Sequence, residues 1–206
     1  MSREAVAALG VSRETLERLD ILVETLGRWN RRINLVAPGS ISDAWRRHVL
    51  DSAQLWRLAL PSARHWVDLG SGGGFPGLVI AAQAAVERPD LRVTMIESDS
   101  RKAAFLTTTA QLMHLDVTVL VDRIEQAPAQ GADIVSARAL APLDRLLPLA
   151  ARHGHARTVY LLPKGRGHHS ELTAARASWH MSCAAHPSRT DAEGVVLAIT
   201  EVRARL

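Results

Sequence analysis

Glycine is concentrated in one short run, residues 65–77, and this run constrains the fold more than any other part of the chain. An apolar segment ends at Asp68 and Leu69, five glycines follow within eight residues, and a second apolar segment occupies 78–82. This order predicts a strand, a tight loop and a helix, because glycine has no Cβ and tolerates positive φ. The first turn of such a helix offers free N–H groups to a polar or anionic ligand. The run therefore predicts a nucleotide-like ligand site at the carboxyl end of a first parallel strand.

The glycines can be aligned in two frames, which indicate different cofactors. Gly72, Gly74 and Gly77 fit G-x-G-x-x-G, the fingerprint of dinucleotide binding. The other frame begins at Asp68 and continues through Gly70, Gly72 and Gly74, and it resembles the first motif of S-adenosylmethionine-dependent methyltransferases. S-adenosylmethionine has no pyrophosphate to place on the helix dipole, but its ammonium group suits an acid at a strand end. We therefore favour S-adenosylmethionine over NAD.

From Trp66 onward, predicted strands alternate with predicted helices. The strands are expected at 66–69, 92–97, 117–121, 133–137, 158–162, 179–184 and 195–202, and the helices at 77–87, 101–114, 143–153 and 168–177. This alternation predicts a doubly wound, mostly parallel sheet. The last two strands have no helix between them and suggest a closing antiparallel hairpin. We expect an α/β, Rossmann-like class I methyltransferase fold with seven strands.

The sequence of residues 1–60 predicts a helical extension, which we expect to pack on a domain formed by residues 61–206. Ser12 is a plausible N-cap, and six apolar residues then recur at helical spacing: Leu16, Leu19, Leu22, Leu26, Trp29 and Ile33. Pro38-Gly39-Ser40 is expected to break the pattern, and a second helix is expected near Ser42. That helix should carry Trp45, Val49 and Trp56 inward.

The extension also holds a group of basic residues that has two interpretations. Its members are Arg28, Arg31, Arg32, Arg46, Arg47 and His48. They form either a solvated face or a face that contacts phosphates. The net charge of +4 and the pI of about 10.1 favour an acidic partner such as nucleic acid.

Composition also limits the location and class of the protein. No apolar run approaches the ~20 residues of a membrane span, and the N-terminus shows no signal-peptide core. A single cysteine, Cys183, gives no internal disulfide framework and fits a reducing compartment. We expect a cytoplasmic monomer with no membrane partner. His153, His155, His168 and His169 lack a carboxylate or cysteine at recognisable spacing, so no metal site is expected.

Candidate site residues follow the strands in turn. Glu97 ends the second strand, where a carboxylate can accept hydrogen bonds from both ribose hydroxyls of a cofactor. NAD enzymes use the same device, so this residue does not distinguish the two cofactors. Ile124 follows the third strand and is expected near an adenine ring. Arg138 ends the fourth strand at the position that faces the reacting methyl group, and an arginine there is costly to bury unpaired. Lys164 ends the fifth strand in a basic loop that could hold RNA phosphate.

These motifs, in this order, resemble the family of bacterial small-subunit (16S) rRNA guanine-N7 methyltransferases, also called RsmG or the glucose-inhibited division protein B family. The resemblance covers nearly the whole chain. Its motifs are Trp29-Asn30-x-x-Ile33-Asn34-Leu35, Arg47-His48-x-x-Asp51-Ser52, Asp68 to Gly77 with the Phe75-Pro76-Gly77 ending, Arg123-Ile124-Glu125, Ser136-Ala137-Arg138-Ala139 and Lys164-Gly165. One departure is Ala137, which stands where the family runs serine directly into arginine, so the role of Ser136 is open.

The resemblance implies which residues bind cofactor and substrate. The cofactor set that it implies is Gly70, Phe75, Ile124, Glu125 and Arg138, in addition to Asp68, Gly72, Gly74 and Glu97 of the motifs above. Our candidates for contact with the RNA are Asn34, His48, Arg123 and Lys164. The substrate would be one guanine of 16S rRNA near the decoding region, in free RNA, the small ribosomal subunit or an assembly intermediate. Arg138, the one residue expected at the reaction, could hold the cofactor carboxylate or orient guanine O6.

Three other functions compete with this one. An NAD-dependent oxidoreductase would need a proton-relay residue, and the sequence shows no clear relay, with Tyr160 as the only tyrosine. An RNA-binding module with a vestigial cofactor fold is disfavoured by the intact Asp68 and glycine loop. A small-molecule methyltransferase is disfavoured by the basic extension.

Overall fold

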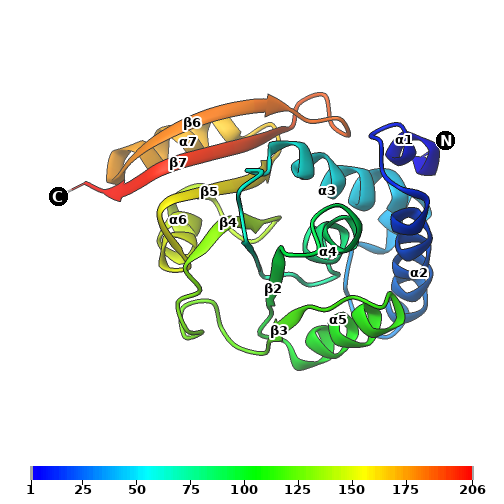
Figure 1. Cartoon of the computed structure of the whole chain (residues 1–206). Coiled ribbons are helices and arrows are strands. Elements are labelled where there is room, and N and C mark those ends of the chain that lie inside the picture. The colour runs from blue at the N-terminus through cyan, green and yellow to red at the C-terminus, as the bar shows by residue number, and fades with distance from the viewer. Residues whose placement is uncertain (1, 206) are drawn as a thin grey trace.

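The computed structural model describes residues 2–205 and places one seven-stranded sheet at the centre of the chain (Figure 1). The strands are β1 (His65–Leu69), β2 (Arg92–Ile96), β3 (Thr118–Leu120), β4 (Ala132–Ala137), β5 (Gly154–Lys164), β6 (Trp179–Pro187) and β7 (Val195–Ala204). Their order is β3-β2-β1-β4-β5-β7-β6. Strands β1 to β5 pair in parallel, whereas β7 is antiparallel to both β5 and β6. This confirms the predicted, mostly parallel sheet with a closing hairpin.

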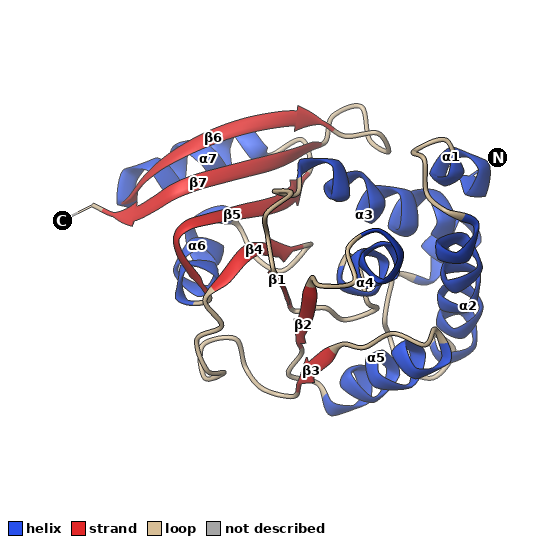
Figure 2. Cartoon of the chain, in the orientation of Figure 1, coloured by secondary structure: helices blue, strands red, loops and turns tan. Residues whose placement is uncertain are grey.

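Helices cover both faces of the sheet (Figure 2). They are α4 (Gly77–Glu87), α5 (Ser100–Leu112), α6 (Leu143–Arg152) and α7 (His168–Ser178). Successive side chains of β1 point to opposite faces of the sheet, and each face has its own buried cluster. Trp66 packs in a cluster with Ile80 of α4, whereas Val67 packs in a cluster with Leu146 of α6 and Leu172 of α7. Both faces of β1 are buried, which explains its continuous apolar run.

The helical extension packs on α4 and α5. It contains α1 (Ser2–Ala7) and α2 (Arg13–Trp29), and the Ser12 side chain caps α2 by accepting a hydrogen bond from the backbone N–H of Thr15. Leu19 of α2 lies in one buried cluster with Val79 of α4 and Phe105 of α5. The extension and the sheet domain therefore share a core.

The second half of the extension differs from the prediction. The first long helix ends at Trp29, and Pro38 then starts a helical turn instead of breaking one, because proline is compatible with the first turn of a helix. A stretch of mixed helical turns follows, through η1 (Pro38–Asp43), η2 (Trp45–Leu50), α3 (Asp51–Ala53) and η3 (Gln54–Leu58).

The three residues expected to point inward from this stretch differ in burial. Only Val49 is fully buried, whereas Trp45 and Trp56 are half-buried. Each tryptophan lies under an arginine guanidinium, Arg3 over Trp45 and Arg88 over Trp56. Both rings still pack against buried clusters, as expected, and the arginine covers the part of each ring that stays at the surface.

The parallel register brings the predicted site residues to one edge of the sheet. Leu69 at the end of β1 pairs with Ile96 of β2 on one side and with Ala137 of β4 on the other. The residues that follow these strands, including Glu97 and Arg138, therefore leave the sheet beside the glycine loop. No helix within residues 2–205 is long and apolar enough to cross a membrane.

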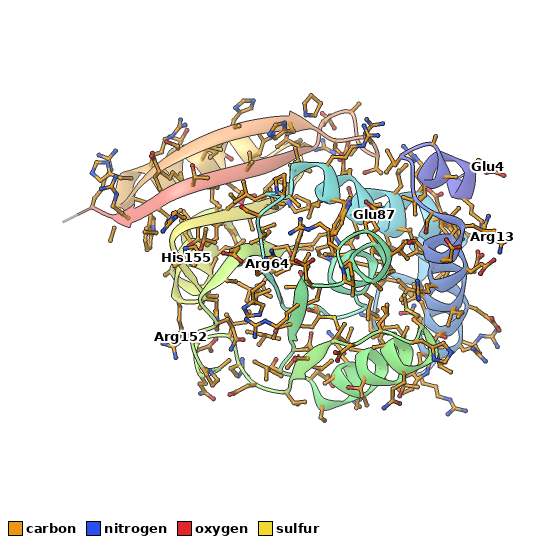
Figure 3. All side chains as sticks on the ribbon, viewed as in Figure 1. Glu4, Arg13, Arg64, Glu87, Arg152 and His155 are labelled. Atoms are coloured by element: carbon orange, nitrogen blue, oxygen red, sulfur yellow. The ribbon has the colours of Figure 1, made fainter. Side chains whose placement is uncertain are left out.

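The opposite edge, where the parallel strands begin, carries ion pairs at its surface. Arg64 precedes β1 and pairs with Asp90, and His155 near the start of β5 lies 3.1 Å from Oδ1 of Asp133 (Figure 3). The other oxygen of Asp133 accepts the backbone N–H groups of Arg64 and His65, at 2.7 and 3.0 Å. These contacts fasten the amino ends of β1, β4 and β5 to one another, away from the glycine loop.

Candidate functional site

The glycine loop folds tightly against the end of β2. Gly70, Gly72 and Gly74 have φ values of +64°, +49° and +83°, which a side chain would strain. The backbone N–H of Gly70 donates to the carbonyl of Ile96 at 2.8 Å. Among the described residues, a Cβ added to Gly72 would meet only the carbonyl oxygen of Gly70, at 3.8 Å, so the space above Gly72 is open.

Asp68 lies beneath this loop and is fully buried. Its Oδ2 accepts the backbone N–H of Gly77 at 3.2 Å, and its Oδ1 accepts the hydroxyl of Ser136 at 2.7 Å. The Ser136 hydroxyl in turn accepts the indole N–H of Trp66 at 2.8 Å. Burial raises the pKa of Asp68 to about 6, although the hydrogen bonds from Ser71, Ser136 and Gly77 oppose that rise. Ser136, whose role the sequence left open, thus fixes the acid that holds the loop.

Glu97 closes the loop from the other side. One carboxylate oxygen accepts the backbone N–H of Gly72 at 2.8 Å, and the other accepts the backbone N–H of Asp99, also at 2.8 Å. The side chain is nearly buried. Each carboxylate oxygen has further acceptor capacity, so Glu97 can hold the loop and still accept hydrogen bonds from ligand hydroxyls.

Arg138 joins the glycine loop to the helical extension. Its guanidinium lies 5.3 Å from the centroid of the Phe75 ring. Its Nη1 donates to the carbonyl of Arg47 at 3.1 Å and to Nδ1 of His48 at 3.0 Å, and it lies 3.5 Å from Oδ2 of Asp51. Burial lowers the pKa of the guanidinium, while Asp51 and Asp68 raise it. The ion pair and hydrogen bonds satisfy the requirement that a buried arginine be paired.

His48 is a buried part of this arrangement. The hydroxyl of Ser40 donates to the carbonyl of Ala37 at 2.7 Å, so Nε2 of His48 donates to Ser40 at 2.8 Å and Nδ1 accepts from Arg138. Burial, followed by the neighbouring charges of Arg138 and Arg47, lowers the pKa of His48 to about 4. The imidazole is therefore neutral and turned inward, with 8% of the residue exposed.

A cavity of about 830 Å³ opens beside Arg138. Its walls come from the extension, from the ends of β4 and β5 and from the β6–β7 connection, and they include Arg46, Arg47, Asp51, residues 138–142 and 163–165, Glu171, Ser188 and Thr190. Lys164 lies in the wall with only 9% of its side chain exposed. Its Nζ donates to the carbonyl of Ala141 at 2.8 Å and pairs with Glu171 at 2.7 Å.

The remaining predicted residues lie around the same edge. Ile124 is buried, and its carbonyl oxygen lies 2.8 Å from Nε2 of His153. Arg123 and Glu125 are exposed on either side of it. Asn34 is exposed in the segment that follows α2.

The sequence did not indicate the role of two residues that shape the site. Asn30 folds the segment 30–36, because its Oδ1 accepts the backbone N–H groups of Leu35 and Val36, both at 2.9 Å. Leu35 and Val36 then pack so close to Gly73 that a Cβ there would lie 3.2–3.3 Å from them. The second residue is Asp51, which pairs with Arg138. Both stand in the motifs of the extension, but nothing in the sequence says what they contact.

Similarities to known proteins bear on this site. A model of the family "rRNA small subunit methyltransferase G" matches residues 15–196. "Ribosomal RNA small subunit methyltransferase G" of Paramagnetospirillum magneticum is 51% identical over 199 residues, covering 97% of this chain and 95% of that protein. The protein of the same name from Cereibacter sphaeroides is 48% identical over 197 residues, 96% of each chain. A TehB-like SAM-dependent methyltransferase from Corynebacterium glutamicum is similar in fold, with a TM-score of 0.58, 15% identity and coverage of 79% of this chain and 92% of that chain.

Proposed function

The chain belongs to the rRNA small subunit methyltransferase G family, and from this premise we propose that it methylates N7 of one guanine in 16S rRNA, with S-adenosylmethionine as methyl donor. The observation that carries the proposal is the position of Arg138. This side chain packs on Phe75 of the glycine loop and also lines the 830 Å³ cavity. One residue thus borders both a cofactor site and a space for a substrate.

The residues at the glycine loop fit S-adenosylmethionine. The space above Gly72 is open, and the buried carboxylate of Glu97 lies against the Gly72 N–H with capacity to accept ribose hydroxyls. Ile124 can pack against the adenine ring. These features suit a nucleoside, and membership of the family decides for S-adenosylmethionine over NAD. The fold is that of class I methyltransferases.

We assign Asp68 a role that differs from the direct contact suggested by its sequence motif. Asp68 is fully buried beneath the loop, with its oxygens turned to Gly77 and Ser136 inside the protein. Asp68 therefore positions the loop rather than touching the cofactor ammonium group. Gly70, Gly74 and Phe75 form the wall of the site, and the exposed Glu125 lies beside Ile124 at its rim.

The reaction at guanine N7 needs no general base, because N7 carries an in-plane lone pair and no proton. When bound, S-adenosylmethionine supplies a methyl group activated by its sulfonium. The contribution of the protein is to hold N7 in line with that methyl group, and proximity and alignment can contribute up to about 7–11 kcal/mol. Arg138 suits this task because its contacts with Phe75, His48 and Asp51 fix it in one position.

The target guanine must present its N7 edge, which is inaccessible in the deep major groove of A-form RNA. An unpaired or flipped guanine in a loop is therefore the expected substrate. Asn34 and Arg123 are exposed beside the site and are proposed to contact the RNA. His48 and Lys164 are held by internal partners, so we propose that they position the site instead. A ribosomal substrate implies that the enzyme, which we propose is a monomer, acts in the cytoplasm.

The test is methyl transfer from labelled S-adenosylmethionine to small ribosomal subunits that lack the modification, followed by chemical cleavage at N7-methylguanine. We expect cleavage at a single guanine. Gly72→Asp should abolish it, since a side chain at φ +49° would occupy the open space above the loop. Label that enters another atom or another RNA, or no label at all, would contradict the proposed substrate.

A further inference from the structure

A second cleft on the protein is lined by arginines and is distinct from the cavity beside Arg138. Its volume is about 610 Å³, within the ~300–1,000 Å³ typical of ligand pockets. It lies between the end of α2, the segment that follows it and the first turns of α5. Its lining includes Arg28, Arg31, Arg32, Arg101, Trp29 and Ile33. The structure thus divides the basic group of the extension, since Arg46 and Arg47 line the other cavity.

The arginines of this cleft carry more positive charge than nearby acids neutralise. Arg28 pairs with Glu24 at 3.7 Å and Arg101 pairs with Asp99 at 3.2 Å, both in exposed positions where an ion pair is weak. Arg31 and Arg32 have no ion pair or side-chain hydrogen bond with any residue in the described part of the chain. Among residues 2–205, the lining of the cleft includes no acidic side chain. The unneutralised charge favours an anionic occupant.

The floor of the cleft is apolar. Trp29 is half-buried and packs edge-on against Phe105, with ring centroids 5.7 Å apart. Ile33 lies beside it, also half-buried. Arginine forms forked hydrogen bonds with phosphate, and an aromatic ring supports a stacked base. Cations at the rim and an aromatic floor are the combination that binds a nucleotide with its base unstacked.

The cleft lies at the same edge of the sheet as the cofactor site. Arg101 is in the first turn of α5, which starts just after Glu97. Ile33 belongs to the segment whose residues Leu35 and Val36 pack against Gly73 of the glycine loop. The cleft and the cofactor site therefore both border the glycine loop.

We propose that the cleft formed by Arg28, Arg31, Arg32, Arg101 and Trp29 binds an unpaired segment of the substrate RNA, with phosphates on the arginines and a base on the apolar floor. This inference rests on the proposed function and extends it, because it assigns a second RNA contact away from the methylated guanine. Within this cleft, Arg31 and Arg32 should contribute most to RNA binding, because Arg28 and Arg101 already have acidic partners.

The test measures the binding of an unmodified 16S rRNA transcript at several salt concentrations. The double variant Arg31→Gln/Arg32→Gln should bind the transcript about tenfold more weakly near 0.1 M salt. The slope of log affinity against log salt should fall by about 1.4, since each of the two single-strand phosphates no longer bound accounts for ~0.7. Arg31→Lys/Arg32→Lys keeps the charges and should retain most of that slope. Affinity for S-adenosylmethionine and the melting temperature should not change in either variant.

A matched control removes two positive charges elsewhere. Arg157 on β5 and Arg176 on α7 are exposed and lie outside the lining of both cavities. Arg157→Gln/Arg176→Gln should keep the wild-type slope. If the two double variants lost RNA affinity equally, net charge alone would explain the loss. The cleft would then have no specific role.

Two further results would also overturn the inference. Arg31→Gln/Arg32→Gln could bind the naked transcript like wild type but fail to bind the assembled small subunit, in which case the cleft contacts a ribosomal protein. It could also bind both like wild type, which would leave the cleft without an RNA role. Methylation by the wild-type protein is measured separately, so failure of the proposed function is distinguishable from failure of the cleft.

Discussion

Asp51 Oδ2 lies 3.5 Å from Nη1 of Arg138, and the two side chains are only 16% and 19% exposed. Oδ1 of the same carboxylate accepts the hydroxyl of Thr190 at 2.8 Å. One acid of the helical extension therefore joins the end of β4 to the connection between β6 and β7. Since Arg138 also packs on Phe75, this pair determines where the guanidinium stands relative to the glycine loop.

Replacing Asp51 with asparagine should impair catalysis more than folding. Asparagine keeps an acceptor for Thr190 but removes the charge that holds Arg138. A hydrogen bond to a charged group contributes about 1.5–3 kcal/mol, so we expect kcat/KM to fall roughly 10- to 100-fold. The measurement is methyl transfer to unmodified small subunits, with thermal melting alongside.

Asp116→Asn is the matched control for this prediction. Asp116 is an exposed acid after α5, and it lies outside the lining of the cavity beside Arg138. The control should have wild-type kinetics. If Asp51→Asn instead reduced stability and activity in equal proportion, its role would be structural only.

The buried Asp68 predicts an unusual pH dependence of stability. Its pKa is about 6 in the folded protein, raised by burial from an ordinary value of 3.8. As pH falls from 7 toward 4, the folded state takes up this proton before the unfolded state does. This group therefore adds stability as pH falls through about 6, and that contribution is lost as pH rises again. Asp68→Asn removes the titration while keeping an oxygen acceptor.

Urea unfolding of both proteins at pH 7 and pH 5 isolates this effect, because other titrating groups are common to the pair. The free energy of unfolding of the wild type, relative to the variant, should rise by about 1 kcal/mol between pH 7 and pH 5. Equal pH dependence in the two proteins would show that the Asp68 carboxyl titrates near its ordinary value.

The sequence predicts the glycine loop and the strand ends well because these features are local. Asp68, the glycines and the following helix lie in one run, and parallel strands bring Glu97 and Arg138 to the same edge wherever the helices pack. The seven strands follow from alternation in the same way. Short-range pattern and a general rule of topology are sufficient for these features.

The contacts of the extension could not be predicted in this way. His48 and Asp51 lie about ninety residues from Arg138 in the chain, and only the packing of the extension against α4 and α5 brings them together. Lys164 shows the same limit, because its basic loop suggested RNA while its partner, Glu171, lies in the next helix. A charged residue in a sequence does not reveal whether an internal partner already neutralises it.

Gly77 and Gly27 should respond in opposite ways to substitution by alanine. A Cβ on Gly77 would lie 2.7 Å from Cγ of Met95 and 2.9 Å from Oδ2 of Asp68, both fully buried. Overpacking of this kind costs about 1–3 kcal/mol. A Cβ on Gly27, inside α2, would meet no described residue within 4 Å, so Gly27→Ala should stabilise the protein by up to ~1 kcal/mol. Urea unfolding measures both, and a stable Gly77→Ala would show that Met95 can move aside.

Lys164 is expected to position the site, not to contact the RNA. Its Nζ holds the carbonyl of Ala141, three residues after Arg138, and pairs with Glu171. Glu171 also accepts the backbone N–H of Leu143 at the start of α6. Lys164 therefore fastens the loop that carries Arg138 to α7, and removal of its ammonium group should loosen that loop.

For Lys164→Met we expect the single-turnover rate at saturating RNA to fall about tenfold, as for the removal of one hydrogen bond to a charged group. The salt dependence of RNA binding should not change, because the buried ammonium contacts no phosphate. Glu171→Gln keeps an acceptor for Leu143 and should show a smaller drop in rate. A wild-type rate at saturation, with the salt slope reduced by about 0.7, would instead make Lys164 a direct phosphate contact. The two roles thus predict opposite changes in two separate measurements.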